Sequence, residues 1–253
     1  MKKLIIAAAV MAAFAGSLAR AEDQKPDNEV SFNASISSDY RLRAISQSRL
    51  KPSLHGGVDY THNPSGFYAG TLLSYITWIK DTPGAGSTPL EVDLYGGKRG
   101  AITKDFTYDV GVMAFIYPGN NMNNATCACH ANANTAEIYG QVGYGPGYIK
   151  YSRAMTNFLG SPNSKNSGYL DLGANIDVIE KLVLNLHVGH QVVVNHSNET
   201  YTDWKIGLTR DFGVVTGAIA VMGTNADKSA YTSPADGSFL GKTSFMVSVS
   251  KTF

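Results

Sequence analysis

Apolar residues recur at every second position along most of this chain, in segments of about ten residues that are separated by polar turns. The first segment, VSFNASIS at 30–37, alternates large apolar or alanine side chains with small polar ones. A period of two places successive side chains on opposite faces of a β-strand, so the segment predicts a strand with one apolar and one polar face. The same pattern repeats to the last residue and predicts an all-β protein.

We count twelve such segments, and the connections between them alternate in length. Short turns fall near 62–66, 100–105, 145–147, 178–181 and 211–213, and longer polar stretches near 41–51, 80–89, 117–134, 157–166, 195–200 and 224–240. Tight turns at one end and long loops at the other are typical of outer-membrane barrels, in which strands of about ten residues cross the membrane at a tilt. The sequence therefore predicts a transmembrane antiparallel β-barrel of about 12 strands, with both termini on the periplasmic side.

A soluble exported β-sandwich or lipocalin-like barrel would also alternate apolar and polar residues, but its apolar face needs bulky side chains for an inner core. Here that face carries scattered alanines and glycines. The last ten residues, SFMVSVSKTF, end on Phe253, which shares its parity with Phe245, Val247 and Val249. This ending resembles the C-terminal signal read by the outer-membrane barrel assembly machinery, although Lys251 departs from it. The alternative is an ordinary edge strand.

The N-terminus has the pattern of an export signal, with a basic start, an apolar run from 4 to 15 and the small-x-small site Ala19-Arg20-Ala21. A membrane anchor would need roughly 20 apolar residues, and the run breaks at Gly16. We expect a cleaved signal peptide at 1–21, a flexible periplasmic lead-in at 22–28 and the barrel at 29–253. The chain holds 21 basic and 20 acidic residues without a basic cluster, which argues against nucleic-acid binding.

The stretch SDYRLRAISQS at 38–48, together with Pro52, GGVDY at 56–60 and GFYAG at 66–70, resembles the motif of the TorF-type porin family, also called Gcw_chp. The matching positions are Ser38, Asp39, Tyr40, Arg41, Arg43, Ser46 and Gln47. The chain departs at Ala44, where the family usually has glycine. The resemblance implies a bacterial outer-membrane β-barrel of the porin type, and it leaves the solute undefined.

If the polar parity faces inward, the lumen contains nine acidic and six basic residues, a set that includes Asp171, Asp177 and Lys242. The candidates for lining or constricting it are Asp39, Arg41, Arg43, Asp59, Glu91, Asp93, Arg99, Asp109, Glu137, Lys150, Asp203 and Lys205. Charged rings of this kind set pore selectivity, here weakly in favour of cations. The alternative is that acids and bases pair and fill a narrow barrel. Continued alternation past Tyr40 predicts that Leu42 and Ala44 face lipid.

Aromatic residues near predicted strand ends or on the outward parity suggest a membrane-interface girdle. They are Tyr40, Tyr60, Trp78, Tyr108, Tyr144, Tyr151 and Trp204. A binding cage is the alternative.

Catalysis and metal binding have weaker support. Twelve-stranded outer-membrane phospholipases use a His-x-Ser pair, whose spacing puts both side chains on one face of a strand. Here His196 and Ser197 are adjacent, and His55 and His187 are single polar lining residues, so we expect no enzyme. The loop NNMNNATCACHANAN at 120–134 offers soft ligands in Met122, Cys127, Cys129 and His130. Their spacing matches neither zinc nor haem motifs, and a local disulfide is the alternative.

Together these patterns predict a porin or porin-like channel that passes small polar solutes or ions and needs no cofactor. Its expected partners are outer-membrane lipid, the assembly machinery and the solutes. The alternatives are a plugged structural or adhesive barrel that works through extracellular loops and, with less support, an outer-membrane enzyme.

Overall fold

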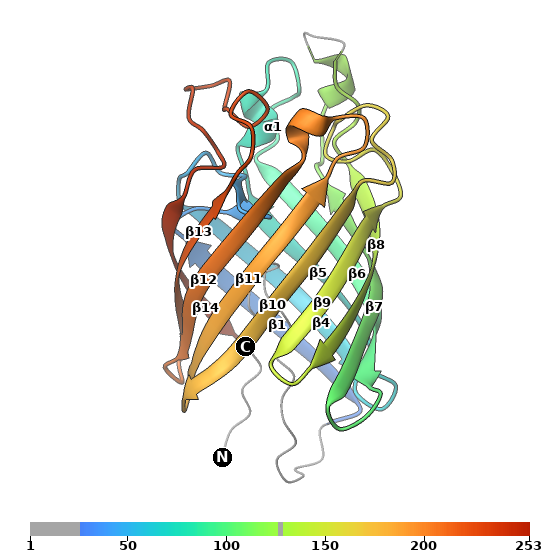
Figure 1. The fold of residues 1–253 in the computed structure, drawn as a ribbon, viewed down its shortest axis with the longest axis vertical. Coiled ribbons are helices and arrows are strands. Elements are labelled where there is room, and N and C mark those ends of the chain that lie inside the picture. The colour runs from blue at the N-terminus through green and yellow to red at the C-terminus, as the bar shows by residue number, and fades with distance from the viewer. Residues whose placement is uncertain (1–25, 126–128) are drawn as a thin grey trace.

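The computed structural model describes residues 26–125 and 129–253 and consists of one closed antiparallel β-barrel (Figure 1). Its strands are β1 Asn28–Ser37, β4 Ser53–His62, β5 Phe67–Tyr75, β6 Leu90–Ala101, β7 Phe106–Ile116, β8 Thr135–Tyr144, β9 Gly147–Ala154, β10 Gly168–Ile179, β11 Leu182–Val192, β12 Tyr201–Asp211, β13 Thr216–Thr224 and β14 Ser244–Thr252. The barrel wall does not include the short strands β2 Arg41–Leu42 and β3 Ile45–Ser46, the helix α1 Trp78–Asp81 or the two 3-10 turns Met122–Asn124 and Ser197–Glu199.

Each wall strand pairs antiparallel with the next, and β1 closes the cylinder by pairing with both β4 and β14. The register joins Asn28 to His62 on one edge of β1 and Ser35 to Ser250 on the other. Closure satisfies the backbone hydrogen bonds without an open edge, as a sheet surrounded by lipid requires. The predicted twelve-stranded barrel is confirmed. None of the helices in the described ranges is long and apolar enough to cross a membrane.

The apolar parity lies on the outside of the barrel. Phe32 on β1 is 55% exposed, Leu54 on β4 is 65% exposed and Val112 on β7 is 56% exposed. A continuous exposed apolar band is the surface that a barrel presents to hydrocarbon. The polar parity therefore points into the barrel, as the alternation predicts.

Inside the barrel, tyrosine rings lie across glycines of neighbouring strands. Tyr68 covers Gly97 and Tyr95 covers Gly70, with ring atoms so close that an added Cβ would lie 2.6 Å from the Tyr68 hydroxyl oxygen and 2.5 Å from the Tyr95 ring. Tyr139 covers Gly111 and Tyr148 covers Gly173 in the same way. Glycine leaves the space in which a large ring can lie flat in a narrow lumen. This packing gives a structural role to four of the 26 glycines and four of the 14 tyrosines.

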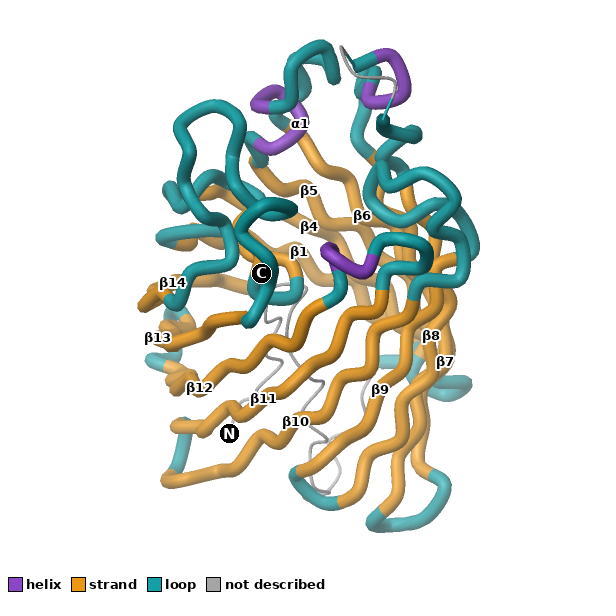
Figure 2. The backbone as a smooth tube through the Cα atoms, turned by 45° about the horizontal axis from the view of Figure 1, so that its top comes forward, coloured by secondary structure: helices purple, strands orange, loops and turns teal. Residues whose placement is uncertain are grey.

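The two ends of the barrel differ. Turns of a few residues join the strands at one end, and the long connections gather at the other, which Figure 2 brings forward together with α1. The N-terminal end of β1 lies at the short-turn end, and the Phe253 amide donates to the Phe32 carbonyl at 2.8 Å. The predicted signal peptide at 1–21 and residues 22–25 of the predicted lead-in are outside the described residues.

Candidate functional site

Residues 38–50, named here the inner hairpin, leave β1 and turn into the barrel instead of extending its wall. Every residue from Asp39 to Ser48 is at most 7% exposed. Strands β2 and β3 pair Arg41 with Ser46, and the two residues at the tip, Arg43 and Ala44, have φ values of 49° and 61°. Positive φ at both positions is characteristic of the type I′ turn that closes a two-residue hairpin.

The prediction that alternation continues past Tyr40 was therefore wrong. Leu42 is 6% exposed and Ala44 is 2% exposed, so neither faces lipid. Ala44 packs against Met222 and Met246 inside the barrel. The chain reverses because two non-glycine residues adopt the left-handed conformation, which a pattern of apolar and polar residues does not report.

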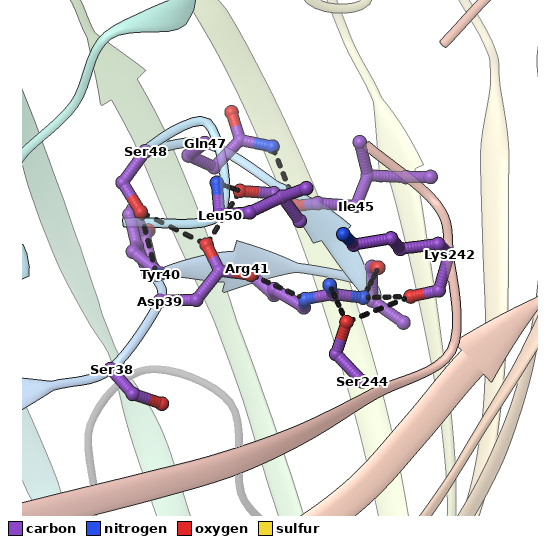
Figure 3. A network of polar contacts seen from close by, with 12 residues as sticks. Ser38, Asp39, Tyr40, Arg41, Ile45, Gln47, Ser48, Leu50, Lys242 and Ser244 are labelled. Carbon is purple, nitrogen blue, oxygen red and sulfur yellow. Dashed lines mark hydrogen bonds and ion pairs between the residues drawn. The ribbon is translucent and has the colours of Figure 1, made fainter. Parts of the chain in front are cut away.

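Asp39 organises the base of the inner hairpin (Figure 3). Its carboxylate accepts hydrogen bonds from Arg41 Nε at 2.7 Å and from the hydroxyls of Ser46 and Ser48 at 2.5 and 2.9 Å. Arg41 in turn donates to the Lys242 carbonyl at 2.8 Å and to Ser244 Oγ at 2.8 Å. Arg41 thus pairs with Asp39 within the inner hairpin, and its contacts with Lys242 and Ser244 hold the inner hairpin against the beginning of β14.

Arg43, at the tip of the inner hairpin, reaches across the barrel. Its guanidinium donates to Glu137 Oε2 on β8 at 2.7 Å and to Gln191 Oε1 on β11 at 2.6 Å. It also lies 4.3 Å from the centre of the Tyr169 ring on β10. In the closed strand order β8 lies nearly opposite β1, from which the inner hairpin starts. The inner hairpin therefore spans the interior in the half near the long loops.

Tyr40 and Trp78 are not outward-facing girdle residues, which corrects two of the predicted positions. Tyr40 is 6% exposed, and its hydroxyl donates to Glu91 inside the barrel. Burial, followed by the nearby carboxylates of Glu91 and Asp93, raises the pKa of Tyr40 well above its ordinary value, so this hydroxyl keeps its proton. Trp78 lies in α1, where its ring packs edge to face on Tyr117 with centroids 5.0 Å apart.

The other predicted aromatics are on the outward parity. Tyr60 is 39% exposed, Tyr144 is 62% exposed and Trp204 is 37% exposed. Tyr151 is 50% exposed, and Tyr108 is partly exposed on the same parity as its exposed neighbours Phe106 and Val110. Their role as a membrane-interface girdle stays a prediction.

The half of the interior near the short turns is less buried and lined by paired polar groups. Asp59 accepts from Asn33 Nδ2 at 2.9 Å and from the Tyr95 hydroxyl at 2.5 Å. Asp109 accepts from the Tyr68 hydroxyl at 2.6 Å. The basic groups lie over aromatic rings of the lumen: Arg99 is 4.9 Å from the Tyr68 ring centre and Lys150 is 4.0 Å from that of Tyr139.

His187 lies between two carboxylates on neighbouring strands. Its Nδ1 is 2.8 Å from Asp171 Oδ1 on β10, and its Nε2 is 2.7 Å from Asp203 Oδ1 on β12. Lys205, directly opposite His187 on β12, is partly exposed in the same region. The sequence placed these side chains on the inward parity, but only the strand register shows that they meet.

The structure thus brings the predicted lumen residues to the inside of the barrel, in two groups. Asp39, Arg41 and Arg43 belong to the inner hairpin, Glu91 and Glu137 contact it, and Asp93 lies two residues from Glu91 on the same face of β6. The others line the wall: Asp59, Arg99, Asp109, Lys150, Asp203 and Lys205. Asp177 and Lys242, the outermost members of the wider lumen set, are exposed at the ends of the barrel.

The loop considered for metal binding is described only in part. Cys129 is disulfide-bonded, and Cys127 lies outside the described residues. No group of three or more His, Cys, Asp and Glu side chains with metal-binding geometry, His130 included, occurs at 26–125 and 129–253. The ring of His196 faces Glu199 at 3.2 Å and the Pro162 carbonyl at 2.7 Å.

The closed twelve-stranded antiparallel barrel of this chain has the fold of solved porins. It is similar to the KdgM porin solved with disordered oligogalacturonate, with a TM-score of 0.55 at 6% identity over 88% of this chain and 98% of that one. It is also similar to the NanC porin, with a TM-score of 0.55 at 9% identity over 89% of this chain and 99% of that one.

The particular family follows from the sequence. The model of the family described as bacterial protein of unknown function (Gcw_chp) matches residues 21–253, so the chain belongs to the Gcw_chp family. The resemblance inferred from the motif at 38–48 is confirmed to this extent, and its TorF-type designation stays a prediction. No curated protein matches the sequence.

Proposed function

We propose that this protein is a porin-like channel of the bacterial outer membrane that passes small polar solutes or ions and catalyses no reaction. The observation that carries the proposal is the polar, charged interior of a barrel whose outer face is apolar. Such an interior favours hydrated solutes, and its charged side chains set which of them enter. The similarity in fold to two porins agrees with this function.

In this proposal the inner hairpin is the constriction. It narrows the long-loop half of the barrel, where Arg43 crosses the interior, and leaves a polar vestibule on the short-turn side. The short turns and both termini face the periplasm, and the long loops face the outside, as in other outer-membrane barrels. Phe253 acts as part of the signal that the assembly machinery reads, and lipid contacts the apolar outer face.

A plugged structural or adhesive barrel is the second candidate, and the burial of the inner hairpin favours it. Residues 39–48 are at most 7% exposed, so in this conformation little water reaches them. A channel function requires that the inner hairpin leaves a narrow path beside it or moves.

Single-channel recording of the refolded protein in a planar bilayer tests the proposal. We expect stable conductance steps that scale with salt concentration. A bilayer that contains folded barrel but shows no steps across a range of salts would refute the channel and leave the plugged barrel. Recovery of the protein in the soluble periplasmic fraction of cells would refute the membrane location.

A further inference from the structure

Two acidic side chains on β6 are buried in the barrel and form no ion pair within the described part of the chain. Glu91 and Asp93 are two residues apart, point inward and are 0% exposed. Tyr40 donates to Glu91 Oε1, but Glu91 Oε2 and both carboxylate oxygens of Asp93 have no hydrogen-bond partner in the described part of the chain. Three of the four oxygens are therefore left unsatisfied.

Such a pair is costly unless an opposite charge or a proton neutralises it. An ionised carboxylate that is moved out of water loses many kcal/mol of solvation, and two neighbouring carboxylates also repel each other. The arginines of the inner hairpin bind other acids: Arg41 pairs with Asp39, and Arg43 pairs with Glu137. In these ion pairs neither arginine neutralises Glu91 or Asp93.

A buried hydroxyl lies beside this pair: Tyr117 follows directly on the Val92–Ile116 pair of β6 and β7 and is therefore opposite Glu91. Tyr117, in the loop after β7, is 1% exposed, and its hydroxyl is near the Glu91 carboxylate without reaching full hydrogen-bond geometry. Burial, followed by the nearby carboxylates of Glu91 and Asp93, raises the pKa of Tyr117. Thr77 Oγ1 and Trp78 Nε1, which follow β5, are also buried and unpartnered, and the Trp78 ring packs on Tyr117.

We propose that Glu91 and Asp93 bind one divalent cation of the Ca²⁺ type, with the Tyr117 hydroxyl oxygen and water completing its coordination. All the ligand atoms are oxygens, which hard cations prefer over the sulfur and nitrogen ligands of softer metals. Ca²⁺ accepts irregular sets of six to eight oxygens, whereas Mg²⁺ demands an octahedron and keeps much of its water. One divalent charge neutralises both carboxylates.

The bound cation joins three parts of the structure. It connects β6 to the β7–β8 loop through Tyr117 and, through the Tyr40 hydroxyl on Glu91, to the inner hairpin. The inner hairpin is therefore held more firmly when the cation is present. The competing account is that one or both carboxyl groups carry a proton and bind no metal.

Terbium luminescence and thermal unfolding of the refolded full chain in detergent distinguish the two accounts. Tb³⁺ takes the oxygen ligands of Ca²⁺ and emits when an excited aromatic ring lies close to it, as Tyr117 and Trp78 do here. We expect emission that saturates at one ion per chain and is displaced by CaCl2, and a melting temperature about 5 °C higher in saturating Ca²⁺ than in EDTA.

The double variant Glu91→Gln/Asp93→Asn loses the emission and the Ca²⁺-dependent shift, while the control Asp177→Asn/Glu180→Gln, which changes two exposed acids, keeps both. If the double variant does not fold, Tyr117→Phe is used, and a weaker displacement by CaCl2 is expected. Folded wild-type protein without emission or a Ca²⁺-dependent shift would overturn the proposal, as would a double variant that keeps them. Neither readout depends on conductance, so the result is separate from that of the channel test.

Discussion

Arg43 and Glu137 form an ion pair across the inside of the barrel, with Arg43 Nη2 2.7 Å from Glu137 Oε2 and the two side chains 8% and 4% exposed. The pair joins the tip of the inner hairpin to β8. Arg43 lies in the segment that follows β1, and Glu137 lies on β8, nearly opposite β1 in the barrel. Their contact therefore determines how far the inner hairpin extends across the lumen.

Replacing Arg43 with serine should raise single-channel conductance and shift selectivity toward cations. The change removes bulk from the constriction and leaves the Glu137 charge uncompensated. Reversal potentials in a salt gradient measure the shift. Arg210→Ser, at an exposed position near a short turn, is the matched control and should change neither quantity. Identical traces from both variants would mean that Arg43 only anchors the inner hairpin.

Replacing Arg41 with alanine should destabilise the barrel by about 3–5 kcal/mol, because it leaves the buried Asp39 carboxylate without its counter-charge. Arg49→Ala removes the ion pair with Asp81, in which the arginine side chain is 22% exposed and the aspartate side chain 6% exposed. Because water reaches this arginine in the folded protein, the loss should be smaller than that of Arg41→Ala. Urea unfolding of the refolded proteins in lipid vesicles provides both values. Equal losses would argue against a special role of Arg41.

Gly97→Ala should destabilise the barrel by about 1–3 kcal/mol, because it forces the Tyr68 ring to move. An added Cβ would lie 2.4 Å from the Val110 carbonyl oxygen and 2.6 Å from the Tyr68 hydroxyl. At Gly140 the nearest atom would be 4.0 Å away, so Gly140→Ala should be tolerated. The same unfolding assay compares them, and equal stability of the two variants would contradict the ring-over-glycine packing.

Val112→Arg should cost about 2–4 kcal/mol, because it places a charge on the lipid-facing side in the middle of β7. Ile102→Arg adds the same charge in a short turn, where the side chain is 62% exposed, and should cost less than about 1 kcal/mol. Urea unfolding in lipid vesicles should show this difference in the free energy of unfolding. A similar small cost at both sites would mean that β7 does not contact hydrocarbon.

An epitope inserted between residues 234 and 237, in the long β13–β14 connection, should be labelled on intact cells. The same epitope at 103–105, in the β6–β7 turn, should be labelled only after the outer membrane is permeabilised. This pattern follows from long extracellular loops and short periplasmic turns. The opposite pattern would invert the proposed orientation.

Much of the fold could be predicted from alternation alone. Parity predicted which face of β1, β7 and β12 lies outward, and turn spacing predicted the strand number, because a strand's two faces depend on local order along the chain. The motif at 38–48 also indicates the Gcw_chp family from the sequence alone.

The path of that same motif was decided by the tertiary structure. Arg43 and Ala44 reverse the chain at positive φ without a glycine. Arg43 also donates a hydrogen bond to Glu137, which is 94 residues away in the sequence. Tyr117 likewise lies beside Glu91 because β7 pairs with β6 in this register. Alternation encodes which face a residue takes, whereas barrel closure determines which residues meet inside, and contacts between distant segments hold the inner hairpin there.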